Sequence, residues 1–153
     1  MNEAGLYADR LSVNVEIPKE ENLKLLAPEK DHKSVYAPMR YIQQGVLESS
    51  EERKKHRHAP RFAPAGQSTQ MIVGATAETD KDILYLSSAL YKGPTMRRVY
   101  YSGYISVNTY DKRLPALKQP PLVRENRLYQ ADWLMRFYQF KVAVSYTHLR
   151  AHE

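Results

Sequence analysis

The sequence contains no cysteine in its 153 residues. Disulfide bonds, zinc–thiolate sites and thiol nucleophiles are therefore excluded within this chain. No stretch approaches the roughly 20 apolar residues that a membrane-spanning helix needs, and no basic segment followed by an apolar one forms a secretion leader. From these absences we expect a cytoplasmic protein that does not enter a membrane.

A glycine-rich phosphate loop of the GxGxxG type is also absent. This absence weighs against an α/β enzyme that binds an ordinary phosphate ligand through such a loop. The residues that are present suffice for one domain, since 42% are hydrophobic and 26% are charged. The formal net charge of +6 favours an anionic partner such as phosphate or nucleic acid.

Strand-like and helix-like segments alternate along the chain. The patterns predict strands at 11–17, 70–73 and 97–108, and helical segments at 20–27, 38–52, 80–92 and 127–140. This alternation is typical of a parallel α/β fold.

The segment around residue 75 carries the clearest local signals. Residues 70–73 lack polar alternation, which predicts a strand covered on both faces by helices. Thr79 and Asp82 have the spacing of a capping box, so a helix is expected to begin between them. Its buried stripe is predicted to comprise Ile83, Leu86 and Leu90.

Three further packing predictions follow from spacing. Pro38 is expected in the first turn of its helix, where its missing N–H costs nothing. One face of the strand at 97–108 should hold Val99, Tyr101, Ile105 and Val107. The buried stripe of the last helix should hold Leu128, Ala131, Met135 and Tyr138.

Ligands of parallel α/β folds gather at the carboxyl ends of the strands. That rule nominates Asn14, Glu16, residues 74–78 and residues 104–108 as candidate site residues. A structural alternative exists for each. Asn14 and Glu16 also suit the solvated face of an edge strand, and Gly74 also suits a tight turn.

Basic residues cluster between the second predicted helix and the strand at 70–73. Such a cluster is the nearest feature to a nucleic-acid footprint, although cations at a helix end also interact favourably with the helix dipole. The cluster comprises Arg53, Lys54, Lys55, His56, Arg57, His58 and Arg61. The basic residues of the last helix, Arg124, Arg127 and Arg136, either line a phosphate path or remain solvated.

The stretch MIVGATAETDKDIL, residues 71–84, resembles the IVGxPGETxxDF stretch of radical S-adenosylmethionine (SAM) enzymes. The matching residues are Gly74, Glu78, Thr79 and Asp82. The second half of the turn differs, with Ala75, Thr76 and Ala77 in place of the usual aromatic residue, proline and glycine.

Longer segments extend this resemblance over residues 3–140. The segments at 7–30, 57–80, 98–108 and 124–138 together resemble radical SAM proteins assigned to DNA modification or repair. Those proteins are associated with uracil-DNA glycosylases. Gln139 stands where the family more often has glycine.

The resemblance implies a fold and an activity. Residues 1–143 would form the carboxyl-terminal half of a partial (β/α)6 TIM-like radical SAM barrel, about strands four to six. The full enzyme would use a [4Fe-4S] cluster to generate a 5′-deoxyadenosyl radical from SAM and would act on DNA or a nucleotide. Iron–sulfur clusters are held by thiolates, so the ligands would lie outside this chain. Alone, the chain is then expected to be inactive and to leave a sheet edge open.

The resemblance also implies a cofactor site. Asn14 and Glu16 would bind the ribose hydroxyls, and Tyr104 would contact adenine. The backbone near Gln70, Gly74 and Ala75 would approach the nucleoside. The methionine carboxylate would pair with Arg61 or His58, both of which also suit a solvated loop. A different class of function stays open, namely a nucleic-acid-binding α/β module without a cofactor.

The last residues, VSYTHLRAHE at 144–153, resemble the translation of a common transposon-based sequencing adapter. We therefore expect this segment to be a tail that is not part of the domain. The alternative is a metal- or phosphate-binding tail using His148, Arg150 and His152.

Overall fold

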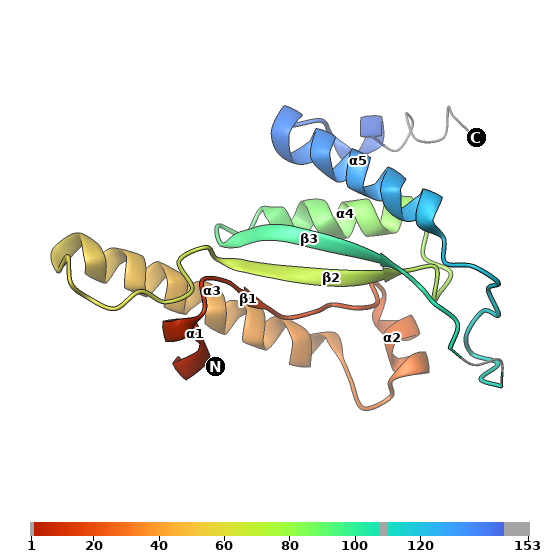
Figure 1. Cartoon of the computed structure of the whole chain (residues 1–153), viewed down its shortest axis with the longest axis horizontal. Coiled ribbons are helices and arrows are strands. Elements are labelled where there is room, and N and C mark those ends of the chain that lie inside the picture. Colours follow the sequence, from red (N-terminus) through yellow and green to blue (C-terminus); the bar gives the residue numbers. More distant parts are fainter. Residues whose placement is uncertain (1, 108–109, 146–153) are drawn as a thin grey trace.

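A computed structural model describes residues 2–107 and 110–145 of the chain (Figure 1). Asn108 and most of the predicted tail, residues 146–153, lie outside this range. Ser145, the second residue of that tail, is buried. The helices are α1 (Asn2–Tyr7), α2 (Glu20–Leu26), α3 (His32–Lys55), α4 (Asp80–Tyr91) and α5 (Leu122–Tyr138), and the strands are β1 (Leu11–Ser12), β2 (Gln67–Val73) and β3 (Met96–Gly103).

The three strands form one parallel sheet in the order β1-β2-β3. Helices α3 and α4 provide the crossovers between consecutive strands, as Figure 1 shows. The prediction of a parallel α/β fold with three adjacent strands is therefore confirmed. A barrel remains a proposal.

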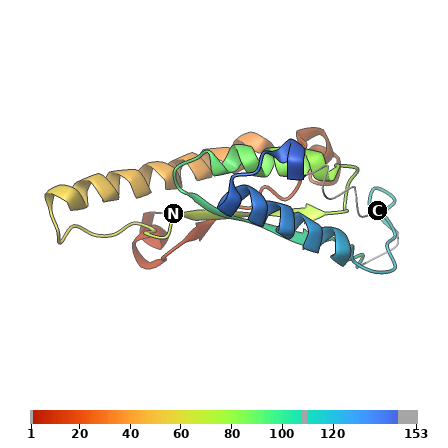
Figure 2. The same ribbon diagram turned by 90° about the horizontal axis from the view of Figure 1, so that it is seen from above.

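One face of the sheet is packed and the other is open, which corrects the prediction that helices cover both faces of β2. Helices α3 and α4 lie on the same side of the sheet (Figure 2). Met71 and Val73 of β2 join the core on that side. Side chains alternate along a strand, so Gln70 and Ile72 point to the opposite face. Of residues 70–73, only Met71 and Val73 therefore face α3 and α4.

The open face carries the polar side chains of the strands. Asn14 and Tyr100 are exposed there, and Gln70 and Ser102 are half-buried. Ile72 lies among these polar residues. It packs at the carboxyl end of the face in a small apolar cluster with Ile17, Leu23 and Ala75.

The first strand is interrupted. Ser12 pairs with Ser68 and Glu16 pairs with Met71. Between these two pairs, the first segment advances four residues while β2 advances three. Glu16 absorbs the extra residue with a left-handed φ of 64°. The predicted strand at 11–17 is therefore two short paired pieces around a bulge.

The third strand ends earlier than predicted. Its last ladder contact is the hydrogen bond from Tyr104 N to Val73 O, 2.8 Å, where β2 also ends. Ile105 and Val107 have no strand left to pair with, and they are 65% and 90% exposed. The predicted apolar face beyond Tyr101 is therefore wrong.

Helix α3 begins six residues before the proline that was expected in its first turn. Asp31 caps the helix, because its Oδ1 accepts a hydrogen bond from Ser34 N at 2.6 Å. Pro38 therefore lies inside the helix. At the start of α4, by contrast, the predicted capping box of Thr79 and Asp82 is confirmed.

Helix α5 closes the outer edge of β3 instead of covering a face of the sheet (Figure 1). Its buried residues are Leu128, Ala131 and Asp132, whereas Tyr138, predicted to be buried, is exposed. Three edge N–H groups of β3 donate to side chains of α4 and α5. The pairs are Val99 N to Tyr91 Oη (2.9 Å), Tyr101 N to Tyr129 Oη (3.0 Å) and Gly103 N to Glu125 Oε2 (2.6 Å).

A buried carboxylate holds the helices against this edge. Asp132 is fully buried and accepts hydrogen bonds from Tyr91 Oη at 2.6 Å and from Arg136 Nε at 2.7 Å. The hydroxyl of Tyr101 also donates to it, at 3.2 Å. The edge of β3 is thus closed by side chains.

Candidate functional site

Three predicted site residues meet at the carboxyl edge of the sheet. Glu16 is bound into this edge by the hydrogen bond from Ile72 N to Glu16 O, 2.8 Å. Tyr104 N donates a hydrogen bond to the backbone oxygen of Val73, the residue that precedes Gly74. The ends of all three strands therefore bring Glu16, Gly74 and Tyr104 to one side of the molecule.

Asn14 and Gln70 lie on the open face, toward the middle of the sheet. Ser12 Oγ donates to Asn14 Oδ1 at 3.0 Å, and the Asn14 amino group has no hydrogen-bond partner among the described residues. The Gln70 amide also has none in that part of the chain. Gln70 stands directly beside Tyr100 in the β2–β3 register. This row offers hydrogen-bond donors, an acceptor and an aromatic ring to a ligand.

The turn after β2 depends on glycine. Gly74 has a φ of +88°, which L side chains rarely adopt. A Cβ atom there would lie 3.0 Å from Cγ of Pro121. Ala75, in contrast, is buried in the apolar cluster with Ile17 and Leu23, so its side chain packs inside the protein.

The charged groups at this edge are largely paired. Glu16 Oε2 lies 3.0 Å from Lys30 Nζ, and Lys19 Nζ lies 3.3 Å from Asp82 Oδ2. Hydrogen bonds from the Thr79 backbone and hydroxyl, followed by the Lys19 charge, lower the pKa of Asp82. A ligand at this edge would therefore meet neutral polar groups in preference to a free charge.

Glu78, a residue of the matched motif, has a structural role. It is buried, and its carboxylate accepts hydrogen bonds from Asn22 Nδ2 at 2.8 Å and from the hydroxyl of Thr76. Arg124 Nη2 donates to its backbone oxygen at 2.6 Å. Glu78 thus joins α2 and α5 to the turn that carries Gly74.

Arg61 and His58 lie at the other end of the sheet. Both precede β2, in the loop that follows α3, and both are exposed. The strands run from this amino end toward Gly74 and Tyr104, so the structure separates Arg61 and His58 from the other predicted residues. This placement argues against the pairing of Arg61 or His58 with a ligand at the carboxyl edge.

Two residues of the open face were missed. Tyr100 and Ser102 alternate with buried Val99 and Tyr101, the pattern of a strand with one solvated face. The alternation was visible in the sequence, where Tyr101 was expected on the packed face. The same two-residue period places Tyr100 and Ser102 on the opposite, solvated face.

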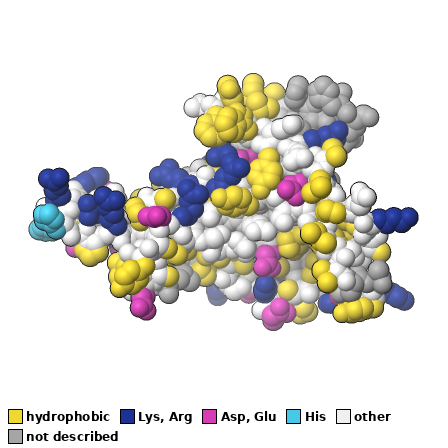
Figure 3. Space-filling view, viewed as in Figure 1, with side chains coloured by type: hydrophobic (Ala, Val, Ile, Leu, Met, Phe, Trp, Pro, Cys, Tyr) yellow, Lys and Arg dark blue, Asp and Glu magenta, His cyan; other side chains and the backbone are white. Residues whose placement is uncertain are grey.

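Basic side chains gather along the end of α3 and beside the start of β3. Figure 3 shows dark blue Lys and Arg side chains over this part of the surface. The nucleic-acid footprint predicted for residues 53–61 therefore lies at the amino ends of the strands. It is separate from the carboxyl edge.

Neither a metal site nor a membrane span is found in the described ranges. Among residues 2–107 and 110–145, no three His, Asp or Glu side chains group in a way that would hold a metal ion. The same residues contain no helix with the length and apolar character needed to cross a membrane.

Comparison of the chain with protein-family models, curated proteins and solved structures gave no match. The resemblance to radical SAM proteins therefore stays a hypothesis, and the geometry described above is what bears on function.

Proposed function

We propose that this chain is the carboxyl-terminal half of a radical SAM barrel and binds the nucleoside part of SAM. The observation that supports this most is the convergence of Glu16, Gly74 and Tyr104 at the carboxyl edge of three adjacent parallel strands. Ligands of parallel α/β folds bind at such an edge.

The one-sided packing of the sheet supports a barrel wall. In a barrel of this kind the helices cover the outside and the strands present their other face to the interior. Here α3 and α4 lie on one face of the sheet, and the polar row of Asn14, Gln70 and Tyr100 lies on the other. That row would face the barrel interior.

The two sheet edges also suit this assignment. The outer edge of β3 is occupied by Tyr91, Tyr129 and Glu125, so another strand would have to displace three hydrogen bonds. No described strand pairs with the outer edge of β1. Additional strands would therefore join at β1, the side on which strands one to three are expected.

Neutral polar groups would hold the nucleoside. The Asn14 amino group and the Gln70 amide can pair with ribose hydroxyls or with adenine nitrogens, because both groups are accessible on the open face. Gly74 allows the backbone to approach the ligand closely. Tyr100 and Tyr104 offer aromatic rings beside them.

The cluster does not fit this chain, which has no cysteine. SAM with a [4Fe-4S] cluster would supply the radical chemistry, and this chain would orient the nucleoside and shield it from water. Action on DNA, and association with a uracil-DNA glycosylase, form part of the proposal through the family resemblance alone.

A second candidate is a nucleic-acid-binding α/β module without a cofactor. It is favoured by the basic surface at the end of α3 and by the net charge of +6. The two candidates differ in whether iron and SAM are used.

The test is an extended protein. The reading frame should be followed on the 5′ side of codon 1, and the longer product reconstituted anaerobically with iron and sulfide. We expect a CxxxCxxC motif in the added segment, an oxygen-sensitive brown absorbance, and reductive cleavage of SAM. A variant with those cysteines replaced by alanine is the control. An extended protein that binds no cluster would favour the module without a cofactor.

A further inference from the structure

We propose that a pocket framed by Arg53, Arg61 and Arg97 binds phosphate groups of a DNA backbone. This site lies at the amino ends of the strands, opposite the cofactor edge. It extends the proposed action on DNA by naming the surface that holds the substrate.

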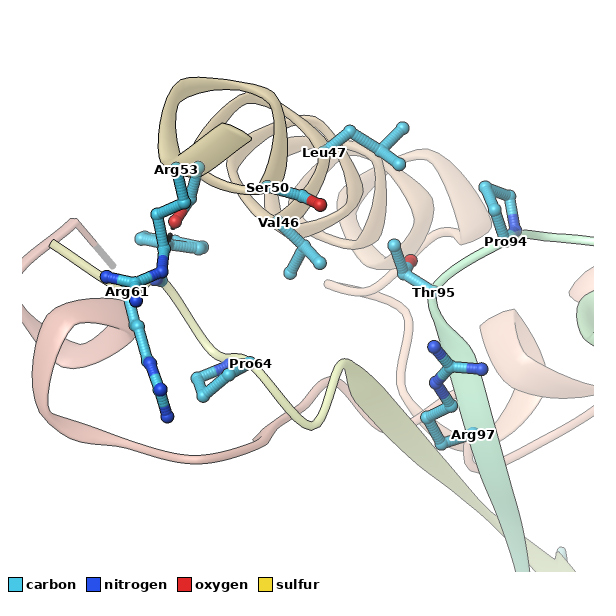
Figure 4. A pocket seen from close by; sticks show the side chains of 11 residues that line it. Val46, Leu47, Ser50, Arg53, Arg61, Pro64, Pro94, Thr95 and Arg97 are labelled. Atoms are coloured by element: carbon cyan, nitrogen blue, oxygen red, sulfur yellow. Dashed lines mark hydrogen bonds between the residues drawn. The ribbon is translucent and has the colours of Figure 1, made fainter. Parts of the chain in front are cut away.

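Three separate segments build the pocket. Arg53 comes from the end of α3, Arg61 from the loop that follows, and Arg97 from the start of β3. The pocket has a volume of about 380 Å³. Figure 4 shows Arg53 and Arg61 on one side of the hollow and Arg97 on the other, with Val46 and Pro64 between them.

The charge of these arginines is not neutralised. Within the part of the chain that the structure describes, no acidic side chain lines the pocket. Among the ion pairs of the described residues, none involves Arg53, Arg61 or Arg97. Among the described residues, Arg98, Arg113, Arg124 and Arg136 do form such pairs, for example Arg124 with Asp80. Guanidinium groups that have no carboxylate partner and border a hollow are suited to bidentate binding of phosphate.

The loop that carries Arg61 is held in place before any ligand arrives. Arg53 Nη1 donates to Ala59 O at 2.5 Å. Ser49 Oγ accepts from Phe62 N at 3.1 Å and donates to Pro60 O at 3.0 Å. Phe62 itself is buried. A preorganised pocket loses little entropy when phosphate binds.

The surroundings favour a polyanion over a single phosphate. Exposed basic side chains continue beyond the pocket along the end of α3 and the following turn, at Lys54, Lys55 and Arg57. Lys54 is paired with Glu51 at 2.6 Å, so the others carry most of the free charge. A row of cations beside a phosphate pocket suits the regular charge spacing of nucleic acid.

The test is DNA binding by the whole chain without SAM or iron. Fluorescence anisotropy with a labelled duplex, and with the matching single strand, is measured at salt concentrations from about 50 to 250 mM. The informative variant is Arg61→Gln with Arg97→Gln, since neither side chain hydrogen-bonds to another of the described residues. The matched control is Lys33→Gln with Lys81→Gln, which removes the same charge from the first turns of α3 and α4, neither of which lines the pocket.

We expect the R61Q/R97Q variant to bind about tenfold more weakly and to lower the slope of log K against log salt by about 2, because each phosphate contact contributes about 0.9. The control variant should stay within about twofold of the natural chain. Equal losses in both variants, or no DNA binding, would overturn the proposal. So would stronger binding to phosphatidylserine vesicles or to a phosphopeptide.

The result is independent of the cofactor proposal. A protein that binds DNA through this pocket but takes up no SAM would overturn only the radical mechanism. Retained SAM binding by a chain that does not bind DNA would overturn only the phosphate site.

Discussion

At the scale of single residues, Gly74 has the most restricted position at the candidate site. Its φ of +88° lies in the left-handed region, and Pro121 occupies the space that a side chain would need. The same glycine matches the radical SAM motif, so a backbone requirement and a motif coincide at one residue.

We expect Gly74→Ala to lower the free energy of unfolding by about 1–2 kcal/mol, because alanine is strained at positive φ and its Cβ would crowd Pro121. Urea denaturation measures the change. Ala77→Ser, at an exposed position in the same turn, is the control and should change stability by no more than about 0.5 kcal/mol. Equal stability of Gly74→Ala and the natural chain would contradict the strain argument.

At the scale of elements, the closed edge of β3 is the most specific feature. Tyr129 Oη accepts from Tyr101 N at 3.0 Å and donates to Tyr101 O at 2.9 Å, replacing both hydrogen bonds of a neighbouring strand. One phenol thus serves both backbone groups of a strand residue.

Tyr129→Phe should therefore destabilise the fold by about 1–3 kcal/mol, the cost of leaving buried backbone groups without partners. It should also increase self-association, because the freed edge can pair with another chain. Urea denaturation and light scattering measure the two effects. Tyr138→Phe, on the same helix but exposed, should change neither. If both variants behave alike, the phenol does not close the edge.

The same tyrosines predict a loss of stability in alkali. Burial, and then the hydrogen bond to Asp132, raise the pKa of Tyr91, and burial also raises that of Tyr101. The unfolded chain loses these protons near pH 10, whereas the folded chain keeps them. Their contribution is therefore complete below about pH 10 and is lost as the pH rises through the folded-state pKa values.

The urea midpoint should consequently change little up to about pH 9 and fall from about pH 10 upward, and Tyr101→Phe should show a smaller fall in that alkaline range. An identical pH profile for the variant and the natural chain would contradict this account.

Local signals in the sequence predicted much of this architecture. The capping box at Thr79 and the order of strands and helices depend on neighbouring residues, and both were correct. Features that depend on distant partners were not predicted. The end of β3 depends on where β2 stops, and the edge closure depends on Tyr129 lying beside Tyr101 across 28 positions of sequence.

The candidate site was predictable to the same extent. The carboxyl-end rule correctly brought Glu16, Gly74 and Tyr104 together. It did not place Arg61, because the residue precedes its strand and only the strand direction shows at which end it lies. Arg97 was also missed, since its association with Arg53 arises from the crossover through α4.

At the scale of the whole molecule, two polar regions lie at opposite ends of one sheet. β2 has seven residues, so at about 3.3 Å per residue roughly 23 Å separates the arginine pocket from the turn at Gly74. A duplex of about seven base pairs covers that distance at 3.4 Å per pair. A phosphate backbone held at one end can thus place a nucleotide near the other, which gives the two proposals a common geometry.

The central claim is that the carboxyl edge and open face of this sheet bind the nucleoside of SAM. The most direct measurement is a titration of the isotope-labelled chain with S-adenosylhomocysteine, followed by backbone amide NMR. We predict weak binding, with shifts concentrated at Glu16, Gly74 and Tyr104 and reduced in the Gln70→Ala variant. Shifts confined to the amino-end pocket around Arg61, or no shift at the three edge residues up to the solubility limit of the ligand, would contradict the account.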